Sequence, residues 1–231
     1  MNFLTGEIIP VNKPYKWTSF GVVARMRWLL TQKLQQKVKV GHAGTLDPLA
    51  TGVLLLCTGR ATKRIEELQA HQKEYIATLK LGATTQSYDR EYPEDKTYPT
   101  DHINLQLIEN TLQQFVGEIY QTPPAHSACK IEGMHAYHLA RKGEDVKLNP
   151  KKIFIQAINI LEYTKPELKL QIVCSKGTYI RALARDIGDA LDSGAYLTQL
   201  ERTRIGDYTI DQCLELDTIP EWLETIQIDK G

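Results

Sequence analysis

The chain has 231 residues, and at ~100–200 residues per domain this length allows one large domain or two small ones. Its 42% hydrophobic and 24% charged residues exclude collagen-like and disordered classes. The longest purely apolar run is Val53–Cys57, far short of the roughly 20 residues that a membrane span needs. Met1–Pro10 has no basic region ahead of an apolar core, as a signal peptide would. We therefore expect a cytoplasmic protein that does not cross a membrane.

The net charge is zero, but the charges are segregated along the chain. Ile8–Ile65 contains ten lysines and arginines and a single acidic residue, Asp47, whereas Ile205–Gly231 contains seven acids and only Lys230 as a base. A segregated basic region is typical of a surface that binds a polyanion such as a nucleic acid. The alternative is a solvated basic surface with no partner.

Hydrophobic periodicity and turn residues predict the secondary structure in chain order. The first half is expected to contain strands over Gly6–Val11, Lys37–Val40, Val53–Cys57 and Lys73–Leu81, and helices from Thr18-Ser19 to Leu30 and over Ala61–His71. After a polar excursion over Thr84–His102 we expect helices over Leu105–Phe115, His135–Lys142, Thr178–Leu191 and Ile219–Ile226, and strands over Ile153–Tyr163, Leu168–Cys174 and Tyr196–Arg204. The irregular mixture of strands and helices favours an α+β fold with a mixed sheet.

The cysteines and histidines do not form a recognisable site. Cys57, Cys129, Cys174 and Cys213 form no CxxC pair, so we expect reduced thiols. The pair His135 and His138 lacks a Cys or Glu at zinc-like spacing. The sequence therefore predicts no metal site.

The loop Gly41–Gly52 carries the acidic residue of the basic region. Pro48 restricts Asp47 to extended backbone conformations, and the flanking glycines allow tight turns and a close approach of a ligand. A carboxylate presented in this way is a candidate nucleophile or base, and the alternative is an Asp that only organises a turn. No GxSxG, HExxH or GxGxxG motif is present.

This loop, GHAGTLDPLATG, resembles the signature of the TruB-type tRNA pseudouridine synthases. Further segments resemble family motifs in the expected order: Asn12-Lys13-Pro14 with Thr18-Ser19, Lys73-Glu74-Tyr75 with Leu81-Gly82, Pro123 to Lys130, Cys174 to Arg181, and Leu200 to Thr203. The resemblance covers roughly residues 6 to 206. It implies an α+β pseudouridine synthase fold, with a mixed, mostly antiparallel central sheet flanked by helices.

The resemblance also implies the organisation of the chain. We expect a single catalytic domain over residues 1–231, in which 206–231 is a short acidic C-terminal segment. The small PUA-like RNA-binding domain that many members append is not expected. In the polar loop after the Leu81-Gly82 pair, Ser87-Tyr88-Asp89 keeps one acid where the family has a DxDG-like run, and His126 stands where a tyrosine is usual.

The implied activity is isomerisation of uridine to pseudouridine at position 55 in the T loop of tRNA. The base is flipped out of its stack, cleaved from the sugar with the help of Asp47 and rejoined through carbon. Arg181 is expected to pair with Asp47, and Tyr75 to stack on the uracil and take the proton from its C5. The remaining substrate-binding residues implied by the resemblance are His42, Tyr179, Leu200, Lys13 and Lys176.

No cofactor and no metal is implied, and the expected partner is the T arm of tRNA, bound by a monomer without an obligate protein partner. Two other readings are a non-catalytic RNA-binding protein on the same scaffold and an unrelated Asp-dependent hydrolase. The first would be expected to have lost Asp47 or Arg181, and both are present. The second lacks any partner motif.

Overall fold

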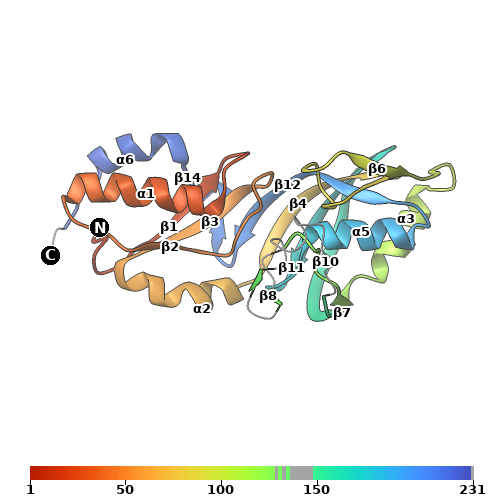
Figure 1. Ribbon diagram of the computed structural model, residues 1–231, viewed down its shortest axis with the longest axis horizontal. Helices are drawn as coiled ribbons and strands as arrows, with labels where there is room; N and C mark the ends of the chain where they lie inside the picture. Colours follow the sequence, from red (N-terminus) through yellow and green to blue (C-terminus); the bar gives the residue numbers. More distant parts are fainter. Residues whose placement is uncertain (128–129, 132–133, 136–147, 230–231) are drawn as a thin grey trace. The chain divides into compact units, whose positions relative to one another are not determined.

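The computed structural model describes residues 1–127, 130–131, 134–135 and 148–229, and the chain forms two compact units (Figure 1). Unit 1 consists of Met1–Glu74 and Glu201–Gly231, and unit 2 of Tyr75–Leu200. Two strands, β4 (Lys73–Leu81) and β12 (Ala195–Ile205), contribute residues to both units. The expected helix over His135–Lys142 lies outside the described residues.

Unit 1 contains a mixed sheet in the order β14-β1-β3-β12, in which β2 also pairs with β3 and β13 with β12. The β1·β3 and β2·β3 pairs are antiparallel, whereas β1·β14 and β3·β12 are parallel. The strands of this sheet besides β12 are β1 (Ile8–Lys13), β2 (Val40–Ala43), β3 (Thr51–Thr58), β13 (Tyr208–Thr209) and β14 (Leu214–Glu215). Its helices are α1 (Ser19–Leu34), α2 (Ile65–Ala70) and α6 (Ile219–Thr225), with 3-10 turns over Gly59–Arg64, Ile210–Gln212 and Leu216–Thr218.

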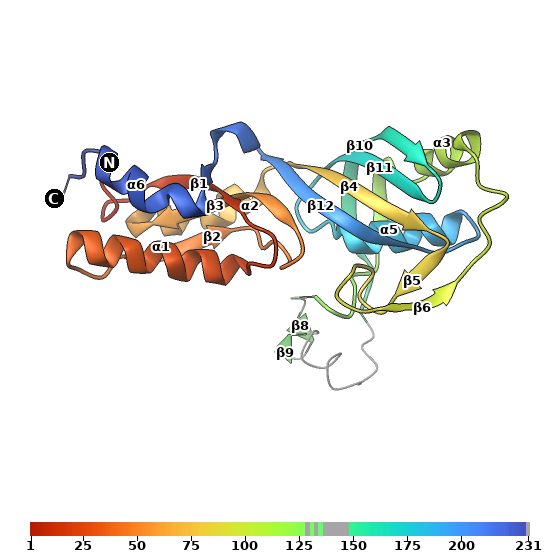
Figure 2. The same cartoon turned by 90° about the horizontal axis from the view of Figure 1, so that it is seen from above.

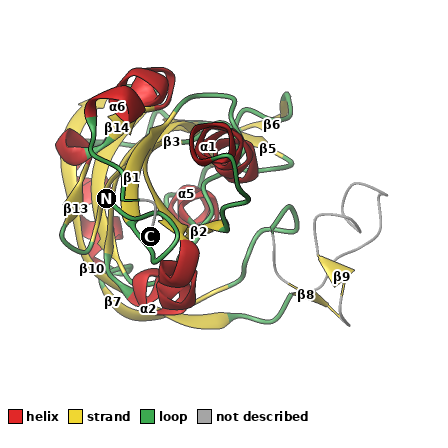
Figure 3. Ribbon diagram, turned by 90° about the vertical axis from the view of Figure 1, so that its left-hand side faces the viewer, coloured by secondary structure: helices red, strands yellow, loops and turns green. Residues whose placement is uncertain are grey.

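Strand β3 is apolar from Val53 to Cys57 because both of its faces are covered. Leu54 and Leu56 pack in one core cluster with α1 and α6, and Val53, Leu55 and Cys57 pack in another with α2. Figure 3 shows α1 and α6 on one side of the sheet and α2 on another. Successive side chains of a strand point to opposite faces, and both faces of β3 meet an apolar core. The uninterrupted apolar run in the sequence follows from this arrangement.

The acidic C-terminal segment is part of the core of unit 1. Leu216, Ile219 and Leu223 are buried in the cluster that α1 also lines, and the ring of Trp222 lies edge-on at 6.2 Å from that of Phe3. Helices α1 and α6 lie side by side (Figures 1 and 2). The helical spacing of apolar residues in this segment, which predicts the helix, thus has a structural reason.

Unit 2 contains the sheet order β12-β4-β11-β10-β7, with helices α3 and α5 packed against it. Its elements besides β4 and β12 are β5 (Ala83–Thr85), β6 (Glu94–Thr97), α3 (Leu105–Gln113), β7 (Gly117–Gln121), β8 (Lys130–Ile131), β9 (Met134–His135), β10 (Lys151–Thr164), β11 (Glu167–Cys174) and α5 (Ile180–Ala190). The β5–β6 and β8–β9 pairs form separate two-stranded ladders. Along β11, buried residues alternate with exposed or half-buried ones, so that one face of this strand meets the core.

The expected fold class is confirmed, as the structure is α+β with a mixed, mostly antiparallel sheet. Strand β4 has the bounds that its alternation predicts, and Thr18 caps α1 as predicted, accepting a hydrogen bond from the Gly21 amide. The strand expected over Lys37–Val40 is wrong in position, since β2 begins at Val40, where pairing with β3 starts. None of the helices in the described ranges has the length and apolarity to cross a bilayer.

Candidate active site

Asp47 lies in the connection 44–50 between β2 and β3, in unit 1. It is half-buried, and its carbonyl accepts a hydrogen bond from the Ala50 amide at 3.1 Å. The loop ends at Gly52, whose φ of +103° and close approach to Arg202 require glycine: an added Cβ would lie 2.2 Å from the Arg202 carbonyl oxygen. The last glycine of the signature therefore lets β12 approach the loop.

Arg202 anchors the first half of this loop. Its side chain is only 1% exposed, and its guanidinium donates to the carbonyls of Val53 (Nε, 2.8 Å), Gly44 (Nη2, 3.0 Å) and Thr45 (Nη1, 3.5 Å). Because an arginine is almost never fully buried without partners, this geometry identifies it as a structural cation. The sequence analysis did not assign it a role, since nothing local marks a strand arginine as buried.

Ser19, the first residue of α1, anchors the middle of the loop. Its hydroxyl accepts a hydrogen bond from the Leu46 amide at 2.9 Å and donates one to the Leu46 carbonyl at 3.0 Å. Both bonds are buried. Since Thr18 caps the helix, Ser19 is available to hold the residue directly before Asp47.

Lys13, at the end of β1, anchors the far side of the loop. The side chain is 0% exposed, and its ammonium donates to the carbonyls of Trp17 (2.6 Å), Pro14 (3.0 Å) and Pro48 (3.3 Å). Burial lowers the pKa of Lys13 from 10.5 to about 8; the Asp47 carboxylate opposes this shift, and a nearby guanidinium adds to it. Lys13 therefore contacts the residue that follows Asp47, as a support for the first motif would require.

His42 lies on β2, half-buried and opposite Leu56 in the β2·β3 register. Burial lowers the pKa of the imidazole, and the Arg202 guanidinium lowers it further. In the described part of the chain, its Nδ1 is buried without a hydrogen-bond partner. The ring is therefore expected to be neutral at pH 7 and able to pack against an uncharged base.

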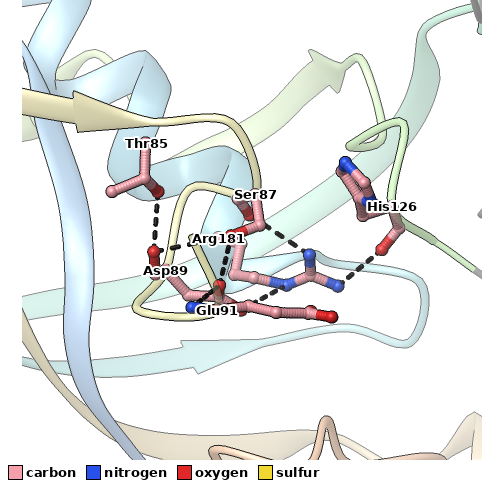
Figure 4. Close-up of polar contacts among 6 residues, drawn as sticks. All are labelled: Thr85, Ser87, Asp89, Glu91, His126 and Arg181. Carbon is pink, nitrogen blue, oxygen red and sulfur yellow. Dashed lines mark hydrogen bonds and ion pairs between the residues drawn. The ribbon is translucent and has the colours of Figure 1, made fainter. Parts of the chain in front are cut away.

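Arg181, the second residue of α5 in unit 2, is buried in a polar cluster (Figure 4). Its guanidinium donates to the carbonyls of Ser87 at 3.2 Å and His126 at 2.9 Å, and its Nε lies 3.6 Å from Asp89 Oδ2. Asp47 belongs to the other unit. The expected pairing of Arg181 with Asp47 stays a prediction.

Asp89 is the counter-charge of Arg181 that the sequence analysis did not assign. Its carboxylate accepts hydrogen bonds from the Ser87 hydroxyl and, at 2.9 Å, from the Glu91 amide, and its carbonyl accepts one from the Thr85 hydroxyl at 2.6 Å. Both members of the ion pair are nearly buried. The acid of Ser87-Tyr88-Asp89 thus orients the guanidinium and compensates its charge.

The other implied substrate-binding residues are distributed over unit 2. Tyr75 is buried on β4, Leu200 is half-buried on β12, and Lys176 is exposed in the turn before α5. Tyr179 precedes α5, and its backbone is held by Gln121, whose amide accepts from the Tyr179 N–H at 2.9 Å and donates to its carbonyl at 3.2 Å. Gln121, like Arg202, is a positioning residue that was not predicted from the sequence.

The site residues that the structure describes offer hydrogen-bonding groups and charges. Among the described residues, no group of three or more His, Cys, Asp or Glu side chains is arranged to hold a metal ion. A half-buried carboxylate on a loop held by buried donors can act as a nucleophile or base without reorganising.

Two family models match the chain. The model of the TruB family pseudouridylate synthase N-terminal domain matches residues 30–180, and that of the tRNA pseudouridylate synthase B C-terminal domain matches residues 181–229. Together they place the chain in the class of the pseudouridine synthases, which are isomerases.

Similar proteins agree with this class. The tRNA pseudouridine synthase B of Phocaeicola vulgatus is 59% identical over 231 residues, covering 100% of this chain and 98% of the relative. The protein of the same name from Clostridium tetani is 44% identical, covering 95% of this chain and 74% of the longer relative. The chain belongs to the TruB family.

Two solved structures contain a chain of similar fold. The chain is similar to a chain in the crystal structure of a Cbf5-Nop10-Gar1 complex, with a TM-score of 0.74 and 28% identity over 98% of this chain and 58% of that chain. It is also similar to a chain in the structure of an H/ACA RNP bound to a substrate RNA containing 2'-deoxyuridine, with a TM-score of 0.69 and 26% identity over 97% of this chain.

Proposed function

We propose that this protein isomerises uridine to pseudouridine at position 55 in the T loop of tRNA, with Asp47 as the catalytic carboxylate. The reaction breaks the bond from the sugar to the ring nitrogen and forms a bond from the same sugar carbon to C5. The C5 proton is lost and the freed nitrogen gains one, so that no atom is added or removed overall. No redox cofactor is required.

In this proposal Asp47 attacks the nucleoside or starts the elimination that frees the uracil. Arg181 pairs with the carboxylate, and Tyr75 stacks on the uracil and takes the C5 proton. The freed base turns within its pocket before the carbon–carbon bond forms. The burial of Tyr75 on β4 supports a stacking role, because a fixed ring can hold the base without losing further conformational freedom.

The substrate enters by base flipping, since the target atom of a stacked base is out of reach. His42 fills the space that the extruded base leaves, and its lowered pKa favours the neutral ring that this contact needs. Tyr179 and Leu200 form the wall of the pocket, and Lys176 contacts the RNA from its exposed turn. The backbone of Tyr179 is fixed by Gln121, which favours a preformed wall.

The single observation that carries the proposal is the anchoring of the Asp47 loop. Three buried side chains from three elements, Arg202, Ser19 and Lys13, hold the peptides on both sides of Asp47. A loop that only closed a turn would not need two buried cations, because burying a charge is costly unless it is paired.

We further expect the protein to act as a monomer in the cytoplasm.

The test is tritium release from a tRNA transcript labelled at C5 of uridine. The wild-type protein should release tritium from one T-loop position, and Asp47→Asn should bind the same RNA and melt at the same temperature without releasing tritium. Turnover above a few per cent of wild type in Asp47→Asn refutes the role of the carboxylate. Binding without release by the wild-type protein would favour the non-catalytic RNA-binding function instead.

A further inference from the structure

Helix α5 carries a second arginine, Arg185, which has no role in the proposed reaction. It lies four residues after Arg181, so the two side chains leave the helix on the same side. Its Nη2 donates to the Thr122 carbonyl at 3.0 Å, and its guanidinium carbon lies 5.1 Å from the centre of the Tyr88 ring, a cation–π distance. Its Nε donates to Asp186 Oδ1 at 2.8 Å.

The two arginines join the same two segments of unit 2. These are the loop 86–93 between β5 and β6 and the segment 122–127 after β7. Arg181 reaches the first through the Ser87 carbonyl and the second through the His126 carbonyl (Figure 4). The second arginine reaches both one helical turn further on. Two points of attachment fix the orientation of the segments as well as the distance between them.

The ring that Arg185 covers belongs to a residue in an unfavourable backbone conformation. Tyr88 has a φ of +60°, which a residue with a Cβ keeps only where its surroundings hold it. It stands between Ser87 and Asp89, and both of these residues contact Arg181. A movement of Tyr88 would therefore displace both contacts.

The carbonyl that Arg185 binds lies beside a second support of the site. Thr122 directly follows Gln121, whose side chain accepts from the Tyr179 N–H at 2.9 Å and donates to the Tyr179 carbonyl at 3.2 Å. The same guanidinium thus holds the chain next to the contacts of Arg181 and next to those of Tyr179.

We propose that Arg185 is a positioning residue for the reaction, which orients Arg181 and Tyr179 without touching the RNA. Its side chain is only 18% exposed and is directed at protein groups. A lysine cannot take its place, because a point charge cannot cover a ring and donate in several fixed directions at once. The inference rests on the proposed function, which makes Arg181 and Tyr179 part of the pocket.

Three variants separate this role from that of an ordinary ion pair. Arg185→Met removes the guanidinium and keeps a long side chain, and Arg185→Lys keeps the charge. The matched control is Asp186→Asn, which removes the acidic partner of Arg185 and leaves its contacts to Thr122 and Tyr88 in place.

The measurements are kcat and KM for tritium release from a tRNA transcript, the melting temperature, and amide hydrogen exchange at Glu91 and Tyr179. The acceptors of these two amides are the Asp89 carboxylate and the Gln121 side chain. Their exchange rates therefore report directly on the supports of Arg181 and Tyr179, and they need no substrate.

Both Arg185 variants should lower kcat at least about tenfold, since a misplacement of ~1 Å can cost ~100-fold in turnover. Their KM should stay within about threefold of wild type, because the lost interaction is not made with bound RNA. Exchange at Glu91 and Tyr179 should become at least about tenfold faster. Asp186→Asn should leave kcat, KM and both exchange rates within about twofold of wild type.

Four results would overturn the inference. Normal kcat in Arg185→Met would remove the positioning role, and recovery of kcat in Arg185→Lys would reduce it to charge. A rise in KM with unchanged kcat would mean that Arg185 contacts the RNA. A loss of kcat that follows the melting temperature, without faster exchange at Glu91 and Tyr179, would make the residue purely structural. Absence of tritium release by the wild-type protein refutes the proposed function instead, and the exchange rates still test whether Arg185 holds the two segments.

Discussion

Replacing Ser19 by alanine should loosen the Asp47 loop and leave the rest of the protein in place. The hydroxyl makes two buried hydrogen bonds, both to the backbone of Leu46. The substitution removes one oxygen atom and therefore creates almost no cavity. Helix α1 keeps its N-terminal cap, because Thr18 supplies it.

The magnitude follows from what is left unpaired. The Leu46 amide and carbonyl each lose a partner, and a buried polar group without a hydrogen bond costs about 1–3 kcal/mol. Removing the hydroxyl also removes its own desolvation cost, which places the net loss in the lower half of the range, at about 2–4 kcal/mol. The Leu46 amide and carbonyl can also regain partners if the loop opens to water. The lost free energy then appears as local opening of the loop at Leu46. The position of Asp47 then becomes variable, and a misplacement of about 1 Å can reduce turnover ~100-fold.

The assay combines urea unfolding, amide hydrogen exchange at Leu46 and single-turnover tritium release. Thr18→Ala is the matched control, since it removes a hydroxyl one residue away that caps the helix without touching the loop. We expect Thr18→Ala to lose about 1 kcal/mol of stability and to keep its turnover. Ser19→Ala should lose Leu46 protection and at least tenfold in kcat. Unchanged exchange at Leu46 with unchanged kcat would refute the anchoring role.

The remaining predictions concern the other charged groups of the site. Asp89→Asn should lower the free energy of unfolding by about 3–5 kcal/mol, because it breaks the buried ion pair between Asp89 and Arg181; a change below 1 kcal/mol would contradict this. For Lys13, the folded pKa of about 8 lies below the unfolded value of 10.5, so the unfolded state binds more protons between these pH values and stability rises with pH there. Urea unfolding from pH 7 to 10.5 should show wild type gaining about 3 kcal/mol relative to Lys13→Met, and a flat difference would exclude the shift. Tyr75→Phe should keep RNA affinity and lose turnover, whereas near-normal tritium release would limit the ring to stacking.

Elements with a local signal could be predicted from the sequence. Strand β4 alternates cleanly, and α1 has both a cap and a helical apolar face. The β5–β6 ladder had no such signal: the residues of β6 are all exposed and polar, so there is no alternation to detect. Its pairing depends on contacts across the intervening turn, which periodicity does not encode.

The residues of the candidate site also differ in whether a local sequence signal points to them. Asp47 could be predicted as a candidate because a rigid Gly/Pro loop presents it within a basic region. Arg202 could not, because its partners are backbone carbonyls exposed by the shape of a loop that lies more than 140 residues earlier in the chain. Asp89 was visible only as the acid that remains in Ser87-Tyr88-Asp89, and its importance depends on the burial of Arg181.

Burial separates two roles among the basic residues of Ile8–Ile65. Lys13 is buried on backbone carbonyls beside Asp47 and cannot reach a phosphate, although composition alone counts it with the RNA-binding cations. Lys37 and Lys39 are exposed in the segment before β2 and can meet the RNA backbone. The first group fixes the geometry of the carboxylate, and the second raises the local concentration of RNA without setting that geometry. Substitutions of exposed lysines should therefore change KM and its salt dependence, whereas substitutions of the anchoring residues should change kcat.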